Sequence, residues 1–163
     1  MASRIDALRP FDVAIFNGDL IDGDGRRSGA TEQLISDRLE QSKIATNFID
    51  LVGADRNILI AGTGYHTGEA EQFESVAADR FGAELRTRRL VEIGPLRIAL
   101  RHHLSGGNAP GGSFIALQKQ MALWMERTAY GDVRPNLLIH SHRHRYLFCE
   151  NSLMAALVTP ALQ

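Results

Sequence analysis

The residues best suited to chemistry lie near the C-terminus, where three of the six histidines occupy alternate positions. His140, His142 and His144 follow the apolar run 137–139. Side chains two residues apart on an extended backbone point to the same face, so a buried strand is expected to end by presenting several imidazoles together. Neutral imidazole is the commonest protein ligand for metals, and it also works as an acid or base near neutral pH. The cluster therefore favours a metal-dependent hydrolytic site.

A carboxylate occupies a comparable position near the N-terminus. Gly18 and Asp19 directly follow the apolar run 11–17, which has the character of a buried strand. Glycine lets the backbone turn sharply and leaves Asp19 at the strand tip, where its two oxygens can bridge two cations. The alternative is an ordinary turn, capped by Asp19 and continued by Asp22 with its following glycine.

Two further segments place histidines after predicted strands. His66 lies in the turn 62–68, whose three glycines indicate either close backbone approach to another group or a flexible connection with a solvated histidine. His102 and His103 follow the strand predicted at 96–101, and adjacent strand residues face opposite ways, so only one is expected to point at a shared site. All four segments follow strands, and open α/β sheets hold their sites at the carboxyl ends of strands.

The hydrophobic pattern alternates between strand and helix character along the chain. Apolar runs predict seven strands and helical spacing predicts three helices, the second of them capped by Thr67. The predicted strands are 11–17, 57–61, 85–93, 96–101, 136–139, 145–149 and 153–159, and the predicted helices are 31–52, 69–81 and 114–128. This order predicts a layered α/β fold in a single domain that spans residues 1–163.

The composition narrows the class of protein. With 44% hydrophobic residues, 23% charged residues and a net charge of -1, the chain has no global field that would attract nucleic acid or an anionic membrane. No apolar run approaches the roughly 18 residues of a membrane-spanning helix, and residues 1–10 carry no signal-peptide core. The one cysteine, Cys149, excludes an internal disulfide and is expected to be a buried apolar strand residue. A cytoplasmic location without membrane contact is therefore expected.

The order of these segments resembles that in the calcineurin-like metallophosphoesterases, and the residues within the blocks are most similar to those of phage or prophage members. Four blocks carry the resemblance: Gly18-Asp19-Leu20-Ile21-Asp22, Gly62-Thr63-Gly64-Tyr65-His66, His103 with His102 as the alternative, and Ser141-His142-Arg143-His144. They span residues 11–159, nearly the whole chain. The resemblance implies a β-sandwich flanked by helices, with a site assembled from four loops.

The resemblance also implies a set of site residues and a cofactor. In the family two divalent ions share a bridging carboxylate, and the mixed ligands suit Mn, Fe, Zn or Ni. Asp19 and His66 are the implied catalytic residues. The implied metal ligands are Asp19, Thr63, His66, His103, His142 and His144, and the implied contacts to substrate phosphate are Arg101 and Arg143. His140 falls at the strand end, outside the motif.

Two departures from the family pattern affect these expectations. Thr63 stands where the family has a metal-binding asparagine, and the histidine of that block is shifted two places to His66. The family's Asp-x-His block is absent, because no histidine precedes Gly18. We therefore expect a chain truncated at its N-terminus and lacking the first strand of the fold. A sheet edge exposed in this way predicts self-association.

The predicted function is divalent-metal-dependent hydrolysis of a phosphodiester or phosphomonoester by a metal-activated hydroxide, with nucleic acid or nucleotides among the candidate substrates. The missing block favours an alternative, a catalytically impaired module that binds metal or a partner. A third hypothesis is a β-lactamase-like metallohydrolase, because His140, His142 and His144 form an alternating triplet. Such folds carry their histidine block early and with an aspartate, so this hypothesis is disfavoured.

Overall fold

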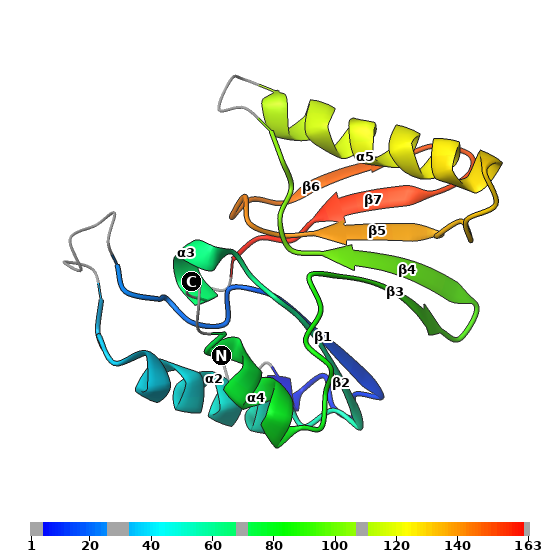
Figure 1. Cartoon of the computed structure of the whole chain (residues 1–163). Coiled ribbons are helices and arrows are strands. Elements are labelled where there is room, and N and C mark those ends of the chain that lie inside the picture. The colour runs from blue at the N-terminus through cyan, green and yellow to red at the C-terminus, as the bar shows by residue number, and fades with distance from the viewer. Residues whose placement is uncertain (1–4, 26–32, 68–71, 107–110, 162–163) are drawn as a thin grey trace. The chain divides into compact units, whose positions relative to one another are not determined.

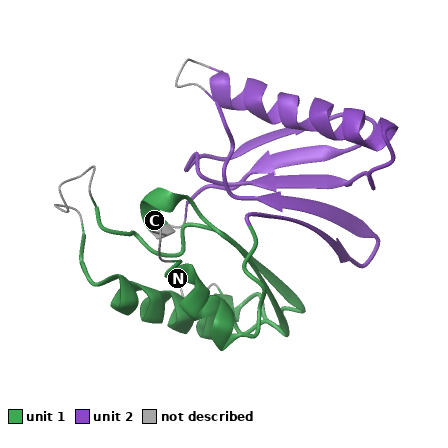
Figure 2. Cartoon of the chain, in the orientation of Figure 1, with its two compact units in different colours: residues 1–86 green, residues 87–163 purple. Residues whose placement is uncertain are grey.

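The chain divides into two compact units in the computed structural model. The first comprises residues 1–86 and the second residues 87–163 (Figure 2). The structure describes residues 5–25, 33–67, 72–106 and 111–161. Within this described part, no helix is long and apolar enough to cross a membrane.

The first unit is built around two parallel strands. Its elements are β1 (Val13–Asn17), α2 (Arg38–Val52), β2 (Arg56–Ile60), α3 (Gly64–Thr67) and α4 (Glu74–Arg80). β1 pairs with β2 in register along its whole length, from Val13 opposite Arg56 to Asn17 opposite Ile60. Parallel strands need a crossover connection, and α2 lies within it. The apolar core joins strand and helix faces through Phe16, Ile49, Leu59, Ala77 and Ala78.

Both helices that the periodicity predicts in the first unit begin later than expected. α2 begins at Arg38 because Asp37 caps it, accepting hydrogen bonds from the Leu39 and Glu40 backbone nitrogens at 2.8 and 3.3 Å. The predicted start at 31 is therefore wrong, and residues 31–32 lie outside the described part. Its predicted end is confirmed, since Gly53 closes the helix with a φ of 64°.

The second predicted helix, 69–81, is also shorter than expected. α4 covers only Glu74–Arg80, and Thr67 ends the short α3 instead of capping α4. The predicted positions 69–71 lie outside the described residues. The hydroxyl of Ser42 in α2 donates to the Phe73 carbonyl at 2.9 Å, which ties α2 to the start of α4 (Figure 1).

The second unit is a five-stranded sheet covered on one face by a helix (Figure 1). Its elements are β3 (Arg88–Ile93), β4 (Leu96–Arg101), α5 (Gly112–Ala129), β5 (Leu137–His140), β6 (Leu147–Glu150) and β7 (Ala155–Val158). The strand order is β3-β4-β5-β7-β6, with β4, β5 and β7 parallel to one another. Leu117 and Met121 of α5 pack on Leu138, Ala156 and Val158 of the sheet. The seven strands predicted from the sequence are all present, shortened by one to three residues at some ends and extended by one residue at the start of β2 and at the ends of β5 and β6.

Candidate metal centre

Asp19, the first predicted ligand, is held by the loop that follows β2. Its Oδ1 accepts hydrogen bonds from the Thr63 backbone nitrogen at 2.7 Å and from the Thr63 hydroxyl at 3.2 Å. Its Oδ2 lies 3.7 Å from the His66 Nε2. The parallel pairing of β1 and β2 explains this meeting, because both strands end at the same edge of their sheet. The structure therefore brings Asp19, Thr63 and His66 together within the first unit.

Gly62 makes the approach to Asp19 sterically feasible. A Cβ at Gly62 would overlap both the Asp19 carboxylate and its backbone nitrogen. On the other side of the turn, Gly23 has a φ of +83°, and a Cβ there would lie 2.8 Å from the Tyr65 carbonyl oxygen. The close backbone approach predicted from the glycines is therefore made to the loop after β1.

His66 is oriented by a backbone carbonyl. Its Nδ1 lies 2.9 Å from the Asp22 carbonyl oxygen, which can only accept, so Nδ1 carries the proton. In the neutral ring, Nε2 is then the basic nitrogen, and it faces the Asp19 carboxylate. The Tyr65 ring supports the imidazole edge-on, with ring centroids 4.7 Å apart. A ring nitrogen fixed by a carbonyl in this way is the usual arrangement of a histidine that binds a metal or moves a proton.

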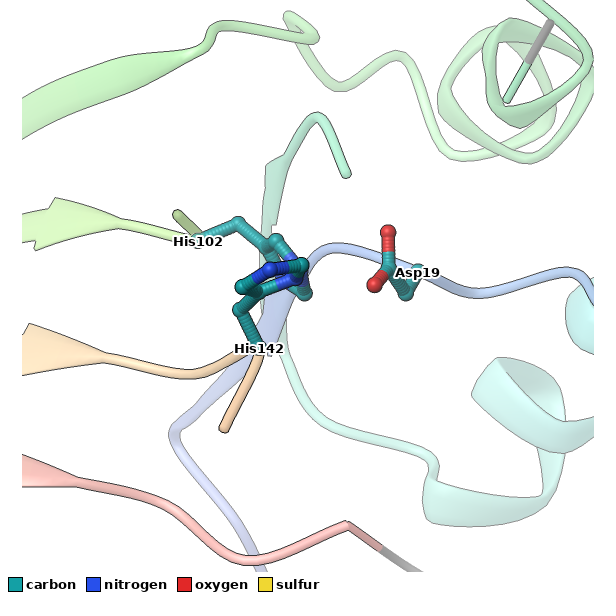
Figure 3. Close-up of side chains that lie close together, drawn as sticks. All are labelled: Asp19, His102 and His142. Carbon is teal, nitrogen blue, oxygen red and sulfur yellow. The ribbon is translucent and has the colours of Figure 1, made fainter. Parts of the chain in front are cut away.

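In the second unit, parallel pairing brings the segments after β4 and β5 together. The Ser141 backbone nitrogen donates to the His102 carbonyl at 2.9 Å. The His102 and His142 ring centroids are 5.4 Å apart, and those of His103 and His142 are 4.8 Å apart. His102 is only 3% exposed, whereas His103 is exposed. Figure 3 shows the His102 and His142 imidazoles beside one another, and the Asp19 carboxylate on the segment after β1.

Three predicted ligands have an unusual backbone conformation. Asp19, His142 and His144 have φ values of 52°, 68° and 52°, and they are the non-glycine residues with positive φ in the described part of the chain. Aspartate and histidine tolerate this region better than most residues, but it is still sparsely populated. Strained backbone of this kind concentrates at functional sites, where the surrounding structure holds it in place.

His140, the last residue of β5, is buried behind these loops. Burial, followed by the nearby positive charge of Arg101, lowers its pKa to about 4, so its imidazole is neutral near pH 7. Its carbonyl accepts from the Thr159 backbone nitrogen at 2.8 Å, and the Thr159 hydroxyl lies 2.7 Å from that of Ser141. The C-terminal end of β7 therefore braces the loop that carries His142.

The predicted phosphate contacts and the last predicted ligand lie at the same end of the second unit. Arg101 is exposed at the end of β4, directly opposite Arg88 of β3. Arg143 donates to the Gly106 carbonyl. His144 is exposed. Their roles in binding phosphate or metal stay predictions.

Glu74 is a site-adjacent residue that the sequence patterns did not single out. It is 1% exposed, and its two carboxylate oxygens accept from the Leu20 and Gly62 backbone nitrogens at 2.7 and 2.8 Å. The one signal in the sequence is the spacing of Glu74 from Ala77 and Ala78, which lie three and four residues later on the same helix face and are buried. That pattern marks a carboxylate on a buried helix face, which must find hydrogen-bond donors.

Comparison with solved structures identifies the fold. Neither a protein-family model nor a curated protein sequence matches the chain. A single-mutant form of Vps29 from Entamoeba histolytica matches with a TM-score of 0.55 and 16% identity, over 98% of this chain and 62% of that one. A structure described as a novel archaeal phosphodiesterase matches with a TM-score of 0.55 and 16% identity, over 98% of this chain and 72% of that one.

These likenesses establish a fold and nothing finer. The chain spans less than two thirds of the Entamoeba protein's length. The predicted fold class, an α/β fold of metallophosphoesterase type, is confirmed.

Proposed function

We propose that this protein is a divalent-metal-dependent phosphoesterase in which Asp19, His102 and His142 supply metal ligands. The observation that carries the proposal is the donor set at the strand ends: Thr63 orients the Asp19 carboxylate in the first unit, and the His102 and His142 ring centroids lie 5.4 Å apart in the second. Each follows a strand, and Asp19 and His142 also have positive φ. A mixed set of this kind favours Mn, Fe, Zn or Ni over Mg or Ca.

The surroundings of Asp19 fit a ligand carboxylate. Thr63 donates twice to Oδ1 and thereby fixes the plane of the carboxylate. We assign Thr63 this orienting role, in place of the ligand role that the resemblance implies for the position. His102 is preferred to His103 as the ligand because it is the buried one of the pair.

A bound divalent cation would polarise a phosphoryl oxygen and lower the pKa of a water molecule. The chain's own contribution to proton transfer is His66. Its Nε2 faces Asp19 and its Nδ1 is held by the Asp22 carbonyl, so the ring can accept or donate a proton at Nε2 without turning. Arg101 and Arg143 are our proposed contacts to the substrate phosphate, because the planar guanidinium group matches phosphate geometry.

One observation favours a second function, a metal- or partner-binding module without catalysis. No histidine precedes Gly18 among these 163 residues, so the Asp-x-His block that serves the second ion in the family is not among them. Of the ligands that the resemblance implies for that ion, these residues include Asp19 and His144, and two protein ligands do not make a tight site. The phosphoesterase and the metal-binding form of the module would both bind the first ion, and only the phosphoesterase would hydrolyse a substrate.

The test combines metal content with hydrolysis of bis-p-nitrophenyl phosphate in the presence of Mn²⁺. Asp19→Asn is expected to lose bound metal and to reduce any turnover by at least about 100-fold, because the ligand charge is removed. Asp12→Asn, an exposed aspartate just before β1, is the matched control and should leave both unchanged. Metal binding without turnover in the wild type would support the binding module. No bound metal at all would refute the phosphoesterase and the metal-binding form of the module.

A further inference from the structure

Glu74 begins α4 with its carboxylate buried, 1% exposed. A buried carboxylate is strongly disfavoured unless hydrogen bonds replace its lost water. Here both oxygens are used: Oε1 accepts from the Leu20 nitrogen at 2.7 Å and Oε2 accepts from the Gly62 nitrogen at 2.8 Å. The two donors come from different loops, one after β1 and one after β2.

The two donors are sequence neighbours of Asp19 and Thr63, which are hydrogen-bonded to each other. Leu20 is the residue after Asp19, and Gly62 is the residue before Thr63. The Thr63 nitrogen in turn donates to Asp19 Oδ1 at 2.7 Å. Asp19, Thr63, Gly62, Glu74 and Leu20 therefore form a closed ring of covalent and hydrogen bonds, all within the first unit.

We propose that Glu74 is a positioning residue that clamps the loop after β1 to the loop after β2 and so sets the orientation of the Asp19 carboxylate. Glu74 acts on Asp19 only through the backbone of Leu20 and Gly62, and we assign it no contact with substrate or metal. Its expected effect on metal affinity rests on the proposed function, whereas its effect on the Asp19–Thr63 hydrogen bond does not.

The clamp requires a carboxylate rather than an amide. Two N–H donors need two acceptors, and a glutamine side chain offers one oxygen and one NH₂ group, which would face an N–H donor. Glu74→Gln is nearly isosteric, so it breaks one of the two bonds without opening a cavity. Glu74→Asp keeps both acceptors on a shorter arm and provides a second variant if Glu74→Gln does not fold.

Asp37 offers a matched control. Its carboxylate also accepts two backbone N–H bonds, from Leu39 and Glu40, but both reach Oδ1, at the exposed start of α2. Asp37→Asn therefore removes a carboxylate charge without removing an acceptor, at a place that touches neither loop, and controls for the loss of charge alone.

The first measurement is made by NMR on the whole chain in EDTA. In Glu74→Gln the amide protons of Leu20 and Gly62 are expected to move upfield, and the Thr63 amide proton, which reports on its bond to Asp19, is expected to move with them. Asp37→Asn should leave all three unchanged. A Thr63 amide that stays at its wild-type position while those of Leu20 and Gly62 move would overturn the proposal.

The second measurement is Mn²⁺ affinity by calorimetry, well below the unfolding temperature of every variant. Glu74→Gln is expected to weaken binding by about 10- to 100-fold, the usual effect of losing a group that orients a ligand. Glu74→Asp should fall between it and the wild type. Wild-type affinity in Glu74→Gln would overturn the positioning role. If the wild type binds no Mn²⁺, the proposed function fails. The chemical shift of the Thr63 amide proton in Glu74→Gln then decides by itself whether Glu74 positions Asp19.

Discussion

At the scale of single residues, backbone groups orient the side chains of the first unit's proposed site residues. Thr63 and Asp22 fix Asp19 and His66 through a backbone nitrogen and a backbone carbonyl. Contacts of this kind depend on how closely two loops approach, and a glycine often controls that distance. Gly62 is the position where this dependence is strongest.

Gly62→Ala is expected to impair the site. The added Cβ would overlap Asp19, so the loops must separate, which should lower the free energy of unfolding by about 1–3 kcal/mol, as for other overpacked positions. Weaker Mn²⁺ binding is expected alongside. Thermal unfolding in EDTA and calorimetric titration measure the two effects.

Gly82→Ala separates this overlap from backbone strain. Gly82 has a φ of +57°, and no atom lies within 4 Å of the place that a Cβ would take, so its substitution strains the backbone without touching the site. Gly82→Ala should lose stability and keep Mn²⁺ affinity. Equal losses of affinity in the two variants would contradict the account of Gly62.

Cys149 gives a prediction about pH. Burial raises the pKa of its thiol above the ordinary value of 9.0, and its Sγ lies 3.3 Å from the Met121 sulfur. Because the thiolate is the reactive form, iodoacetamide at pH 8 to 9 should modify the folded protein more slowly than the same chain in urea. The protonated thiol of Cys149 contributes stability to the folded state below pH 9. This contribution is lost as the pH rises, because the thiol of the unfolded chain releases its proton at a lower pH than the thiol of the folded chain. Equal rates in the two states would contradict the prediction.

At the scale of elements, the sequence predicts strands better than helix starts. Short apolar runs bounded by turn residues predict β1, β2 and β5, and the Gly94-Pro95 turn predicts β3 and β4 on either side of it. β3 shows that a strand need not be apolar throughout, because it carries Arg88, Arg89 and Glu92. The start of α2 was misplaced because Leu34 and Ile35 continue the helical spacing of the true helix. Leu34 is 100% exposed, and the cap at Asp37 decides the boundary. Periodicity does not reveal which of several capping residues is used.

Sequence patterns do not decide between His102 and His103, and they do not single out Glu74. The choice between His102 and His103 depends on where β4 ends, and the strand stops at Arg101, so the alternation of side chains does not extend to either histidine. The role of Glu74 could not be predicted from the sequence, because its hydrogen-bond partners are backbone amides, which every residue except proline has. Asp19, Thr63, His66 and His142 are predicted from their types and order, and their roles stay predictions.

Asp37→Ala tests the start of α2. Removing the capping carboxylate leaves the Leu39 and Glu40 amides without their acceptor, which should lower the free energy of unfolding by about 1 kcal/mol. Urea unfolding followed by circular dichroism measures the change. Glu40→Ala, which removes only an exposed ion pair with Lys43, should cost less. A loss in Asp37→Ala no greater than in Glu40→Ala would contradict the assigned cap.

At the scale of the whole molecule, the proposed ligands are divided between the two units. Asp19 belongs to residues 1–86, and His102 and His142 belong to residues 87–163. Because each proposed ligand is in position only in the folded chain, metal binding favours the folded state. Self-association through the free edge of β1, whose partner in the described sheet is β2, stays a prediction that light scattering at high concentration can check.

Metal should therefore stabilise the protein measurably. Mn²⁺ at 100 times its Kd is expected to raise the free energy of unfolding by about 2.7 kcal/mol and the midpoint by about 5–10 °C. Scanning calorimetry with and without EDTA measures the shift. His142→Ala should abolish it, whereas Asp12→Asn should retain it. An undiminished shift in His142→Ala would exclude that residue as a ligand.

The brace between β7 and the His142 loop has a practical consequence. Thr159 contacts both His140 and Ser141, and it lies four residues before Gln163. In a protein produced from this sequence, a polyhistidine purification tag fused after Gln163 would start a few residues from the loop that carries His142 and would offer competing imidazoles there. Metal content measured on such a fusion would report the tag as well as the protein. An N-terminal or cleavable tag is the better choice for the metal experiments.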